Sequence, residues 1–343
     1  MAGQGYTPGS VSVLGAGSWG TALAVLLARG GRPAVLWGRD PAQIAQMRET
    51  RVNARYLPQT TLPDTLVLED DLGAAVRRSR DVLVAVPSGA FRGTLEAIAP
   101  HCAPDQRLLW ATKGLEAGSG KLLHQVAEEV LGRQVPLGVV SGPTFAAEVA
   151  RGYPTAVTLA VPDEAFCSEM VERFHDDHFR AYRTHDIVGV EVGGAVKNVL
   201  AIATGISDGL GYGANARAAL ITRGLAEATR LAAQLGGETE TLMGLGGLGD
   251  LVLTCTDDQS RNRRLGLALG RGRSMAEAVA EIKQVVEGIE TARVVWEVAQ
   301  REHVEMPITE QVYRVLHEGV APREAVQALL ERDPRHEHPL AEG

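Results

Sequence analysis

The sequence contains few of the residues that build disulfide frameworks or zinc sites. Only three of its 343 residues are cysteine (Cys102, Cys167 and Cys255), and none of them forms a CxxC pair. Such isolated cysteines suit a reducing cytoplasm and provide neither a zinc site nor a disulfide framework. We therefore expect a cytoplasmic protein without a bound metal.

Positive charge is also in deficit, and lysine is scarcer still. The net charge of −8 argues against a general nucleic-acid binder. Hydrophobic residues at 45% and charged residues at 22% describe a soluble chain, whose length predicts two domains. Only four of the 34 basic residues are lysine: Lys113, Lys121, Lys197 and Lys283. A buried lysine can release a proton near neutral pH whereas arginine cannot, so these positions draw attention first.

One stretch lacks charge altogether, the eighteen residues 11–28. A signal peptide would need basic residues before it, but the first basic side chain is Arg29. A membrane-spanning helix would be weakened by three glycines, at roughly 1 kcal/mol each relative to alanine. No other stretch has the composition of a membrane span either, so we expect none in the chain.

Those three glycines instead form the dinucleotide-binding pattern GxGxxG, as Gly15, Gly17 and Gly20. The pattern follows an expected strand at 10–14 and opens an expected helix at 21–29. The first glycine permits a tight turn, the second lets the backbone approach a pyrophosphate, and the third lets helix and strand pack closely. The free N–H groups of the helix N-terminus favour the phosphates.

Further strands alternate with helices up to about residue 186, which indicates a doubly wound parallel sheet. From residue 187 onward the periodicity is helical. We therefore predict an α/β fold: a Rossmann domain with a mostly parallel sheet over residues 1–186, then an all-α domain over 187–343. The expected strands are 34–37, 81–87, 107–112, 135–141, 155–161 and 179–184. The expected helices are 89–99, 119–131, 187–206, 215–234, 261–269, 274–282, 288–301, 307–317 and 321–330.

The residue after the second strand usually reads the ribose of the dinucleotide. Arg39 stands there and favours the 2′-phosphate of NADP, about 20 residues beyond the fingerprint. Asp40 keeps NAD open if the turn shifts by one residue. In the plainer alternative Arg39 is a surface charge, and Asp40 caps a helix that begins at Pro41.

Two lysines stand in segments that we expect to be buried, where a charged side chain is uncommon unless it has a partner or a function. Lys113 ends a buried strand, so either its ammonium reaches the crevice at the carboxyl ends of the strands or it snorkels at a sheet edge. Lys197 interrupts an almost wholly apolar helix in which Gly193 and Gly194 suggest close approach of a backbone or ligand. Desolvation would make Lys197 a usable proton donor and acceptor. The alternative is a buried ion pair with Glu191 or Asp250.

Gly244, Gly246, Gly247 and Gly249 predict a backbone-rich loop that ends at Asp250, which could hold Lys197 in place or bind a substrate hydroxyl. Ser260, Arg261 and Asn262 then open a helix. A hydroxyl, a guanidinium and an amide at a helix N-terminus make a good anion site. Arg263 and Arg264 add positive charge there; in the plainer alternative, part of this run is a solvated face. Together these groups indicate a small phosphorylated carbonyl substrate.

From residue 11 to about 330 the chain resembles the bacterial NAD(P)-dependent glycerol-3-phosphate dehydrogenases. The resemblance is carried by GAGSWGTALA, VPS, TKG, SGPTFAAEVA, GGAVKN, GLGDLVLTCT, SRNRRLG and VVEG, in this order. Val196 departs from the more usual leucine, which affects packing rather than chemistry. The resemblance implies an NAD(P)-dependent oxidoreductase that interconverts dihydroxyacetone phosphate and sn-glycerol 3-phosphate for phospholipid biosynthesis. With Arg39 at the ribose, we expect NADP as the preferred cofactor and NAD as the alternative.

The resemblance also implies the role of each site residue. Lys197 is the expected proton donor and acceptor, assisted by Lys113 and Asp250. The expected cofactor contacts are Gly15, Gly17, Ser18, Trp19, Gly20, Arg39, Lys113, Ala146, Arg261, Val285 and Glu287. The expected substrate contacts are Lys113, Gly142, Thr144, Lys197, Asp250, Ser260, Arg261 and Asn262. A homodimer is plausible because helical second domains often provide an oligomer interface.

Two rival functions remain open from the sequence. One is another lysine-using Rossmann reductase, such as a β-hydroxyacid dehydrogenase, although its carboxylate substrate would not need the phosphate-suited SRNRR cluster. The other is a redox sensor that binds the dinucleotide without turnover. A sensor would not need Lys113, Lys197 and Asp250 together.

Overall fold

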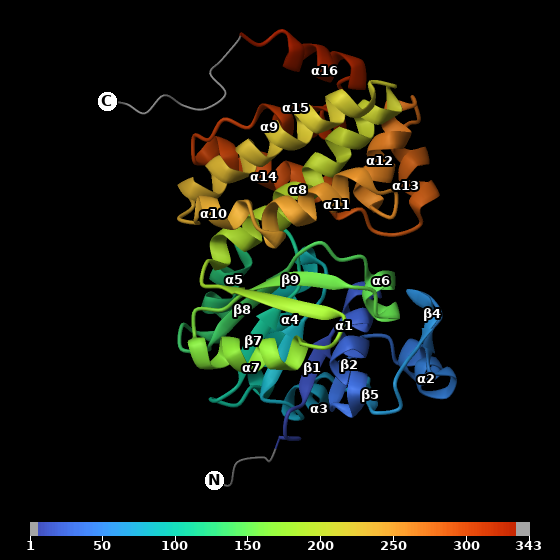
Figure 1. Cartoon of the computed structure of the whole chain (residues 1–343), viewed down its shortest axis with the longest axis vertical. Coiled ribbons are helices and arrows are strands. Elements are labelled where there is room, and N and C mark those ends of the chain that lie inside the picture. Colours follow the sequence, from blue (N-terminus) through green and yellow to red (C-terminus); the bar gives the residue numbers. More distant parts are fainter. Residues whose placement is uncertain (1–5, 334–343) are drawn as a thin grey trace.

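The computed structural model describes residues 6–333, so the outermost parts of the two predicted domains, 1–5 and 334–343, lie outside the described residues. The chain forms two stacked halves (Figure 1). A β-sheet with its flanking helices makes up the N-terminal half, and helices alone make up the C-terminal half. The predicted fold class, a Rossmann-type α/β part followed by an all-α part, is confirmed.

The main sheet has the strand order of a dinucleotide-binding fold. Its eight strands run β10-β9-β8-β7-β6-β1-β2-β5. The six from β5 to β8 are parallel and give the order 3-2-1-4-5-6 expected of a doubly wound sheet. These six strands are β1 (Val11–Leu14), β2 (Ala34–Trp37), β5 (Leu66–Glu69), β6 (Asp81–Val84), β7 (Arg107–Trp110) and β8 (Leu137–Ser141).

Two further strands extend the sheet, as predicted, but with reversed direction. β9 (Thr155–Ala160) pairs with β8 antiparallel, and β10 (Phe179–Thr184) pairs with β9 parallel. A separate two-stranded hairpin, β3 (Val52–Asn53) and β4 (Leu57–Thr61), lies outside this sheet. The sheet is therefore mostly parallel, and the carboxyl ends of β1, β2, β6, β7 and β8 share one edge.

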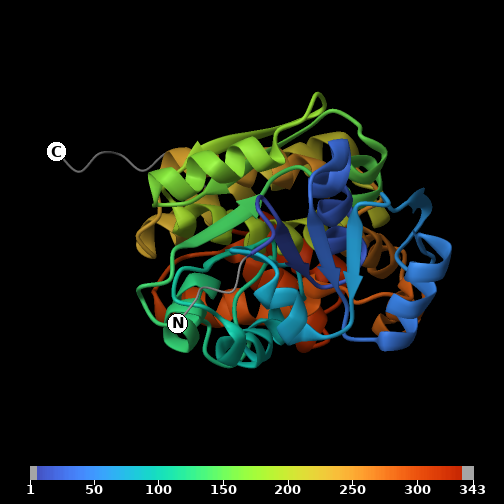
Figure 2. The same ribbon diagram turned by 90° about the horizontal axis from the view of Figure 1, so that it is seen from below.

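Helices of the N-terminal half cover the sheet on both faces (Figure 2). On one face α1, α6 and α7 pack over Val13, Leu36 and Leu159, and on the other α3, α4 and α5 pack over Val82 and Leu108. The helices of this half are α1 (Ser18–Ala28), α2 (Pro41–Thr50), α3 (Leu72–Arg77), α4 (Phe91–Ile98), α5 (Leu123–Leu131), α6 (Ala146–Arg151) and α7 (Glu164–Phe174).

The C-terminal half is built around one buried helix, α8 (Ile187–Gly209), because almost every residue of it is apolar or small. Around it lie α9 (Gly213–Gln234), α10 (Thr239–Leu242), α11 (Asp250–Thr256), α12 (Arg261–Gly270), α13 (Met275–Ile282), α14 (Glu287–Arg301), α15 (Pro307–His317) and α16 (Pro322–Leu330). Contrary to the sequence-based expectation, α8 is long and apolar enough for a membrane span, with a mean hydropathy of 1.5. However, 89% of the apolar 18-residue stretch of α8 to which this hydropathy refers is buried within the fold, so α8 serves as a core helix.

Helices α8 and α12 touch backbone to backbone through glycines. A Cβ atom built on Gly205 of α8 would lie 2.2 Å from the Arg263 carbonyl oxygen, and one on Gly266 of α12 would lie 2.1 Å from that of Ile202. Gly209 and Gly270 repeat the contact one turn further along. This crossing fixes where the N-terminus of α12 stands relative to α8.

Some expected boundaries are wrong for identifiable reasons. α5 begins at Leu123 rather than at 119, because residues 114–122 form a connection with positive φ at Gly114, Gly118 and Gly120. Residues Leu245–Gly249 form a π-helical turn that runs into α11, rather than a loop. β5 and the short β3–β4 hairpin were not predicted. Each of these three strands buries only one or two residues, so the apolar pattern that predicts a buried strand is short in each of them.

The α8–α12 crossing generates a stability prediction. Gly205→Ala should lower the free energy of unfolding by about 1–3 kcal/mol or more, because the added methyl meets backbone that cannot rotate away. Gly93→Ala in α4 is the matched control: nothing lies within 4 Å of its Cβ position, so the change should stabilise by roughly 0.5–1 kcal/mol. Urea unfolding of both variants checks this. Equal stability of the two would contradict the tight crossing.

Candidate active site

The glycine-rich turn has the geometry that each glycine predicts. Gly15 has φ of +123°, and a Cβ there would lie 2.7 Å from the Ala85 carbonyl oxygen. At Gly20 a Cβ would lie 1.9 Å from the Gly15 carbonyl oxygen, whereas nothing lies within 4 Å of the Cβ position of Gly17. The turn is thus closed on its inner side and open at Gly17, where the N-terminus of α1 begins.

Side chains that the sequence analysis missed support this turn from the β3–β4 hairpin and α2. Buried Asn53 donates from Nδ2 to the Ala16 carbonyl at 3.0 Å and to Thr21 Oγ1 at 2.8 Å. Gln43 donates to the same Ala16 carbonyl. The Ser18 hydroxyl donates to the Tyr56 carbonyl at 3.0 Å. Only the fold brings these segments together, so no local motif could have revealed them.

Two neighbouring residues after β2, Arg39 and Asp40, have different roles in the structure. Asp40 caps α2, since its carboxylate accepts hydrogen bonds from the backbone N–H groups of Ala42 and Gln43. Arg39 is exposed and has no hydrogen-bond or ion-pair partner among residues 6–333. The indole Nε1 of Trp19 is buried and unpartnered within the same part of the chain. Arg39 is therefore the group available beside the expected adenosine site.

Two lysines and one carboxylate meet beyond the ends of β7 and β8. Lys197 Nζ lies 2.5 Å from Asp250 Oδ1, and Lys113 Nζ lies 2.5 Å from Asp250 Oδ2. Asp250 is fully buried and Lys197 is 7% exposed. The predicted ion-pair partner of Lys197 is thus Asp250 and not Glu191, which contacts His124. Because two ammonium groups share one carboxylate, the cluster carries an excess positive charge.

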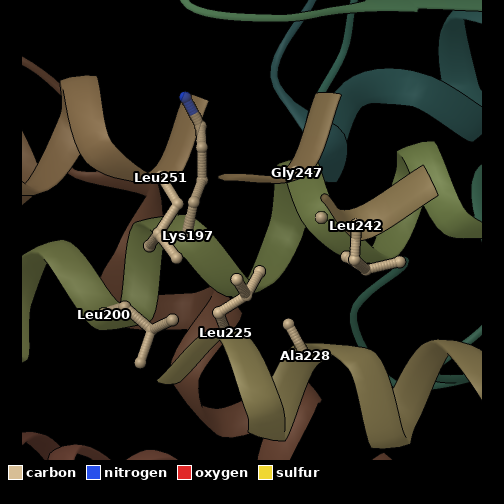
Figure 3. A pocket seen from close by; sticks show the side chains of 8 residues that line it. Lys197, Leu200, Leu225, Ala228, Leu242, Gly247 and Leu251 are labelled. Atoms are coloured by element: carbon tan, nitrogen blue, oxygen red, sulfur yellow. The ribbon is translucent and has the colours of Figure 1, made fainter. Parts of the chain in front are cut away.

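The protein surroundings tune Lys197 toward proton transfer. Its aliphatic chain stands over a small apolar cavity that includes Leu200, Leu225 and Ala228, with the nitrogen pointing away from these side chains (Figure 3). Burial lowers the pKa of Lys197 to about 8, with Lys113 adding to the decrease and Asp250 opposing it. Burial alone would raise the pKa of Asp250, but the two lysines outweigh it and lower the value. The cluster can therefore hold a carboxylate and release an ammonium proton near neutral pH.

Close backbone approach lets α8 reach these groups. A Cβ on Gly193 would lie 2.7 Å from the Gly246 carbonyl oxygen, and one on Gly194 would lie 3.3 Å from Ser141 Oγ. Thr254 also contacts the cluster, because Lys197 Nζ donates to its hydroxyl at 3.0 Å. The sequence analysis missed Thr254, although its i+4 spacing from Asp250 on α11 places both on one helix face.

The expected anion site is only partly available. Arg261 lies at the first turn of α12, where its Nη1 donates to the Val285 carbonyl at 2.8 Å, and Ser260 caps the helix. Asn262 is turned inward: it donates to Asn198 Oδ1 and accepts from the N–H of Gly288.

Arg263 does not add to that site. Its guanidinium is buried and bonded to Asp208 at 2.6 Å, to Asp258 at 2.9 Å and to the Cys255 carbonyl at 3.1 Å. The expectation that Arg263 would supply free positive charge is therefore wrong, because two carboxylates of the same half already neutralise it.

The remaining expected residues lie on two segments, one that follows β8 and one that leads into α14. The Gly142 carbonyl lies 3.5 Å from Lys113 Nζ and accepts the Thr144 hydroxyl at 3.1 Å. Ala146 opens α6. The side chain of Val285 is exposed. Glu287 opens α14, and burial raises its pKa although the charges of Arg261, Lys113 and Lys197 act in the opposite direction.

These features fit a dinucleotide on one side and a small anion on the other. The open Gly17, the N-terminus of α1, the free Arg39 and the unpartnered Trp19 Nε1 offer the groups that phosphates and a ribose need. The Lys113–Asp250–Lys197 cluster joins a lysine that follows β7, at the sheet edge that also carries this turn, to α8 and α11 of the helical half. The arrangement can protonate or deprotonate an oxygen held near Lys197 Nζ while a helix N-terminus holds a phosphate.

Comparisons with known proteins agree with this geometry. Residues 10–167 match the family model of the NAD-dependent glycerol-3-phosphate dehydrogenase N-terminus, and residues 186–327 match the model of its C-terminus. A glycerol-3-phosphate dehydrogenase [NAD(P)+] from Methylococcus capsulatus is 58% identical over 95% of this chain and 98% of its own length.

Solved structures give the same result. The crystal structure of glycerol-3-phosphate dehydrogenase from Coxiella burnetii is 51% identical and superimposes with a TM-score of 0.91, over 94% of this chain and 99% of that one. The yeast glycerol-3-phosphate dehydrogenase is 26% identical with a TM-score of 0.82, over 95% of this chain and 100% of that one. The chain belongs to the NAD-dependent glycerol-3-phosphate dehydrogenase family.

Proposed function

We propose that the protein catalyses the reversible, NAD(P)-dependent reduction of dihydroxyacetone phosphate to sn-glycerol 3-phosphate, and thereby supplies phospholipid biosynthesis. One observation carries the proposal: Lys197 and Asp250 of the helical half form a buried cluster with Lys113, which follows β7 at the sheet edge that also carries the glycine-rich turn. Free Arg39 beside the turn favours NADP over NAD, because Asp40 is already committed to capping α2.

Lys197 supplies the proton. When bound, the reduced nicotinamide cofactor supplies the hydride that reaches the carbonyl carbon. The ketone oxygen then needs a proton, which Lys197 Nζ donates, and in the reverse direction the neutral amine takes it back from the hydroxyl. A pKa of about 8 suits both directions near neutral pH, because neither protonation state is rare.

Asp250 and Lys113 hold that proton donor in place and balance its charge. Asp250 accepts from both ammonium groups and so fixes their separation. The surplus positive charge of the cluster stabilises negative charge that develops on the substrate oxygen during reduction. Gly142 and Thr144, at the end of β8, complete this side of the substrate site beside Lys113.

The N-terminus of α12 holds the substrate phosphate. The guanidinium of Arg261 and the hydroxyl of Ser260 supply donors there, and the free N–H groups of the first turn add to them. Asn262 contributes through its remaining amide hydrogen, since its other partners tie α12 to α8 and α14.

The cofactor lies along the edge of the sheet where β1 and β2 end. The glycine-rich turn holds the pyrophosphate and Arg39 reads the ribose. Ala146 of α6 contacts the cofactor from the same half, and Arg261 and Glu287 contact it from the helical half. The proposed cofactor contacts are Gly15, Gly17, Ser18, Trp19, Gly20, Arg39, Lys113, Ala146, Arg261, Val285 and Glu287.

We also propose the division into a cofactor domain, 1–186, and a substrate domain, 187–343, because α8 begins at Ile187. A homodimer through the helical half is supported by exposed apolar side chains there, among them Met243 and Val252. Free thiols at Cys102, Cys167 and Cys255 support a cytoplasmic location.

Lys197→Ala separates an enzyme from a dinucleotide sensor. The variant should lose turnover of dihydroxyacetone phosphate by on the order of 10²–10⁴-fold, the usual contribution of a positioned acid–base group. Its NADPH affinity, followed by fluorescence titration, should remain that of the unaltered protein, because the glycine-rich turn is untouched. Retained turnover in the variant would refute Lys197 as the proton donor.

Arg261→Ala tests the phosphate site. Loss of a charge-assisted hydrogen bond costs about 1.5–3 kcal/mol, so the KM for dihydroxyacetone phosphate should rise roughly tenfold to a hundredfold. Arg271→Ala is the control, since this exposed arginine lies at the opposite end of α12. Steady-state kinetics of both variants decide the matter. A KM that Arg261→Ala leaves unchanged would place the phosphate elsewhere.

A further inference from the structure

Residues 113–122, which connect β7 to α5, pack against the helical half although they belong to the N-terminal half in sequence. Leu115 and Leu122 join the apolar cluster around α8 rather than either cluster of the sheet. Arg301 of α14 donates to the Ser119 carbonyl at 3.2 Å. This connecting segment, which starts at Lys113, is therefore held by the half that carries Lys197.

The first turn of α5, directly after the connecting segment, is bonded to α8 through a buried carboxylate. Glu191 accepts the backbone N–H of His124 at 3.0 Å and lies 2.6 Å from His124 Nδ1. Glu191 is 4% exposed, whereas the His124 side chain is 19% exposed. The carboxylate thus supplies the cap that α5 lacks from its own N-cap residue, Leu122.

A buried carboxylate is costly, so its position in the fold needs an explanation. The proton transfer and phosphate binding described above do not use Glu191. It lies on α8 six residues before Lys197. Lys197 holds the first residue of the connecting segment, Lys113, through Asp250, and Glu191 bonds His124, two residues after the segment ends. Residues at the start of the segment and just after its end are thus both bonded to α8, the first through Asp250 and the second directly.

We propose that Glu191, together with His124, is a positioning residue that fixes the connecting segment 113–122 on α8 and so places the Lys113 ammonium beside Asp250 and Lys197. The kinetic part of this inference rests on the proposed function. The structural part, that Glu191 holds the segment, does not depend on it.

Loss of this anchor has a consequence for proton transfer. The charged or titratable groups that face Lys197 are Lys113, Asp250, Glu287 and Cys255. The charge of Lys113 lowers the pKa of Lys197, so a displaced Lys113 lets that pKa rise. Reduction needs protonated Lys197, and the high-pH decline of kcat should therefore move to higher pH. The charges that act on His124 within residues 6–333 are those of Glu191 and Glu128, and Lys197 is not among them.

The test compares Glu191→Ala with Glu191→Gln in the full chain. Alanine removes every contact to His124, whereas glutamine keeps an acceptor for the His124 N–H and offers a donor to a neutral imidazole. Glu227→Ala is the matched control: this buried carboxylate also caps a helix, through the N–H groups of Ile308 and Thr309, but lies far along the chain from the connecting segment.

Two measurements apply to all three variants, namely hydrogen–deuterium exchange of the 113–125 region and the pH profile of kcat for dihydroxyacetone phosphate reduction. In Glu191→Ala we expect faster hydrogen–deuterium exchange in 113–125 and a kcat lower by on the order of tenfold to a hundredfold. The loss of kcat at high pH should also begin at a higher pH than in the unaltered protein. Glu191→Gln should stay close to the unaltered protein. Glu227→Ala should lose stability without either change.

The outcomes separate the two proposals. If exchange in 113–125 is unchanged in Glu191→Ala, or if Glu227→Ala produces the same kinetic changes, the anchoring role is overturned. If the unaltered protein does not turn over dihydroxyacetone phosphate, the proposed function fails, and the exchange data alone decide whether Glu191 holds the segment. If Glu191→Ala does not fold, His124→Ala takes its place, because it removes the imidazole that Glu191 contacts. Faster exchange in 113–125 of that variant supports the role, and unchanged exchange contradicts it.

Discussion

A single buried carboxylate shared by two ammonium groups is the interaction on which the rest of the site depends. Asp250 lies at the start of α11, and its two oxygens bond Lys113 from the sheet and Lys197 from the central helix. A buried ion pair costs more in desolvation than it returns unless its geometry is good. Here burial lowers the pKa of Lys197, and the charge of Lys113 adds to that decrease. The surplus positive charge also attracts an anionic substrate oxygen.

The packing of the helical half follows from bringing this cluster together. Helix α8 must approach a π-helical turn and α12 closely, and glycines at 193 and 205 remove the side chains that would prevent it. The same helix then presents Lys197 to the site and Glu191 to the start of α5. The same apolar helix therefore contributes both to the stability of the helical half and to the site. Because α8 is buried on nearly all sides, its composition resembles that of a membrane span.

Much of this could be predicted from sequence wherever the signal is local. The glycine fingerprint, the strand at 34–37 and the single lysine in an apolar helix each carry their own physical reason, and the structure has those elements. What local patterns could not supply is contact across the chain. Lys113 and Asp250 are 137 residues apart, and the support that Asn53 gives the glycine turn depends on a distant hairpin. Arg263 is of a residue type that binds anions, but the carboxylates of Asp208 and Asp258 neutralise its charge.

The most direct test of the account is oxidation of NADPH, and separately of NADH, by the unaltered protein with dihydroxyacetone phosphate present or absent. The account predicts oxidation that depends on the phosphorylated ketone, faster with NADPH than with NADH because Arg39 is free to meet the 2′-phosphate. A folded protein that binds NADPH but oxidises neither cofactor in the presence of dihydroxyacetone phosphate would contradict it.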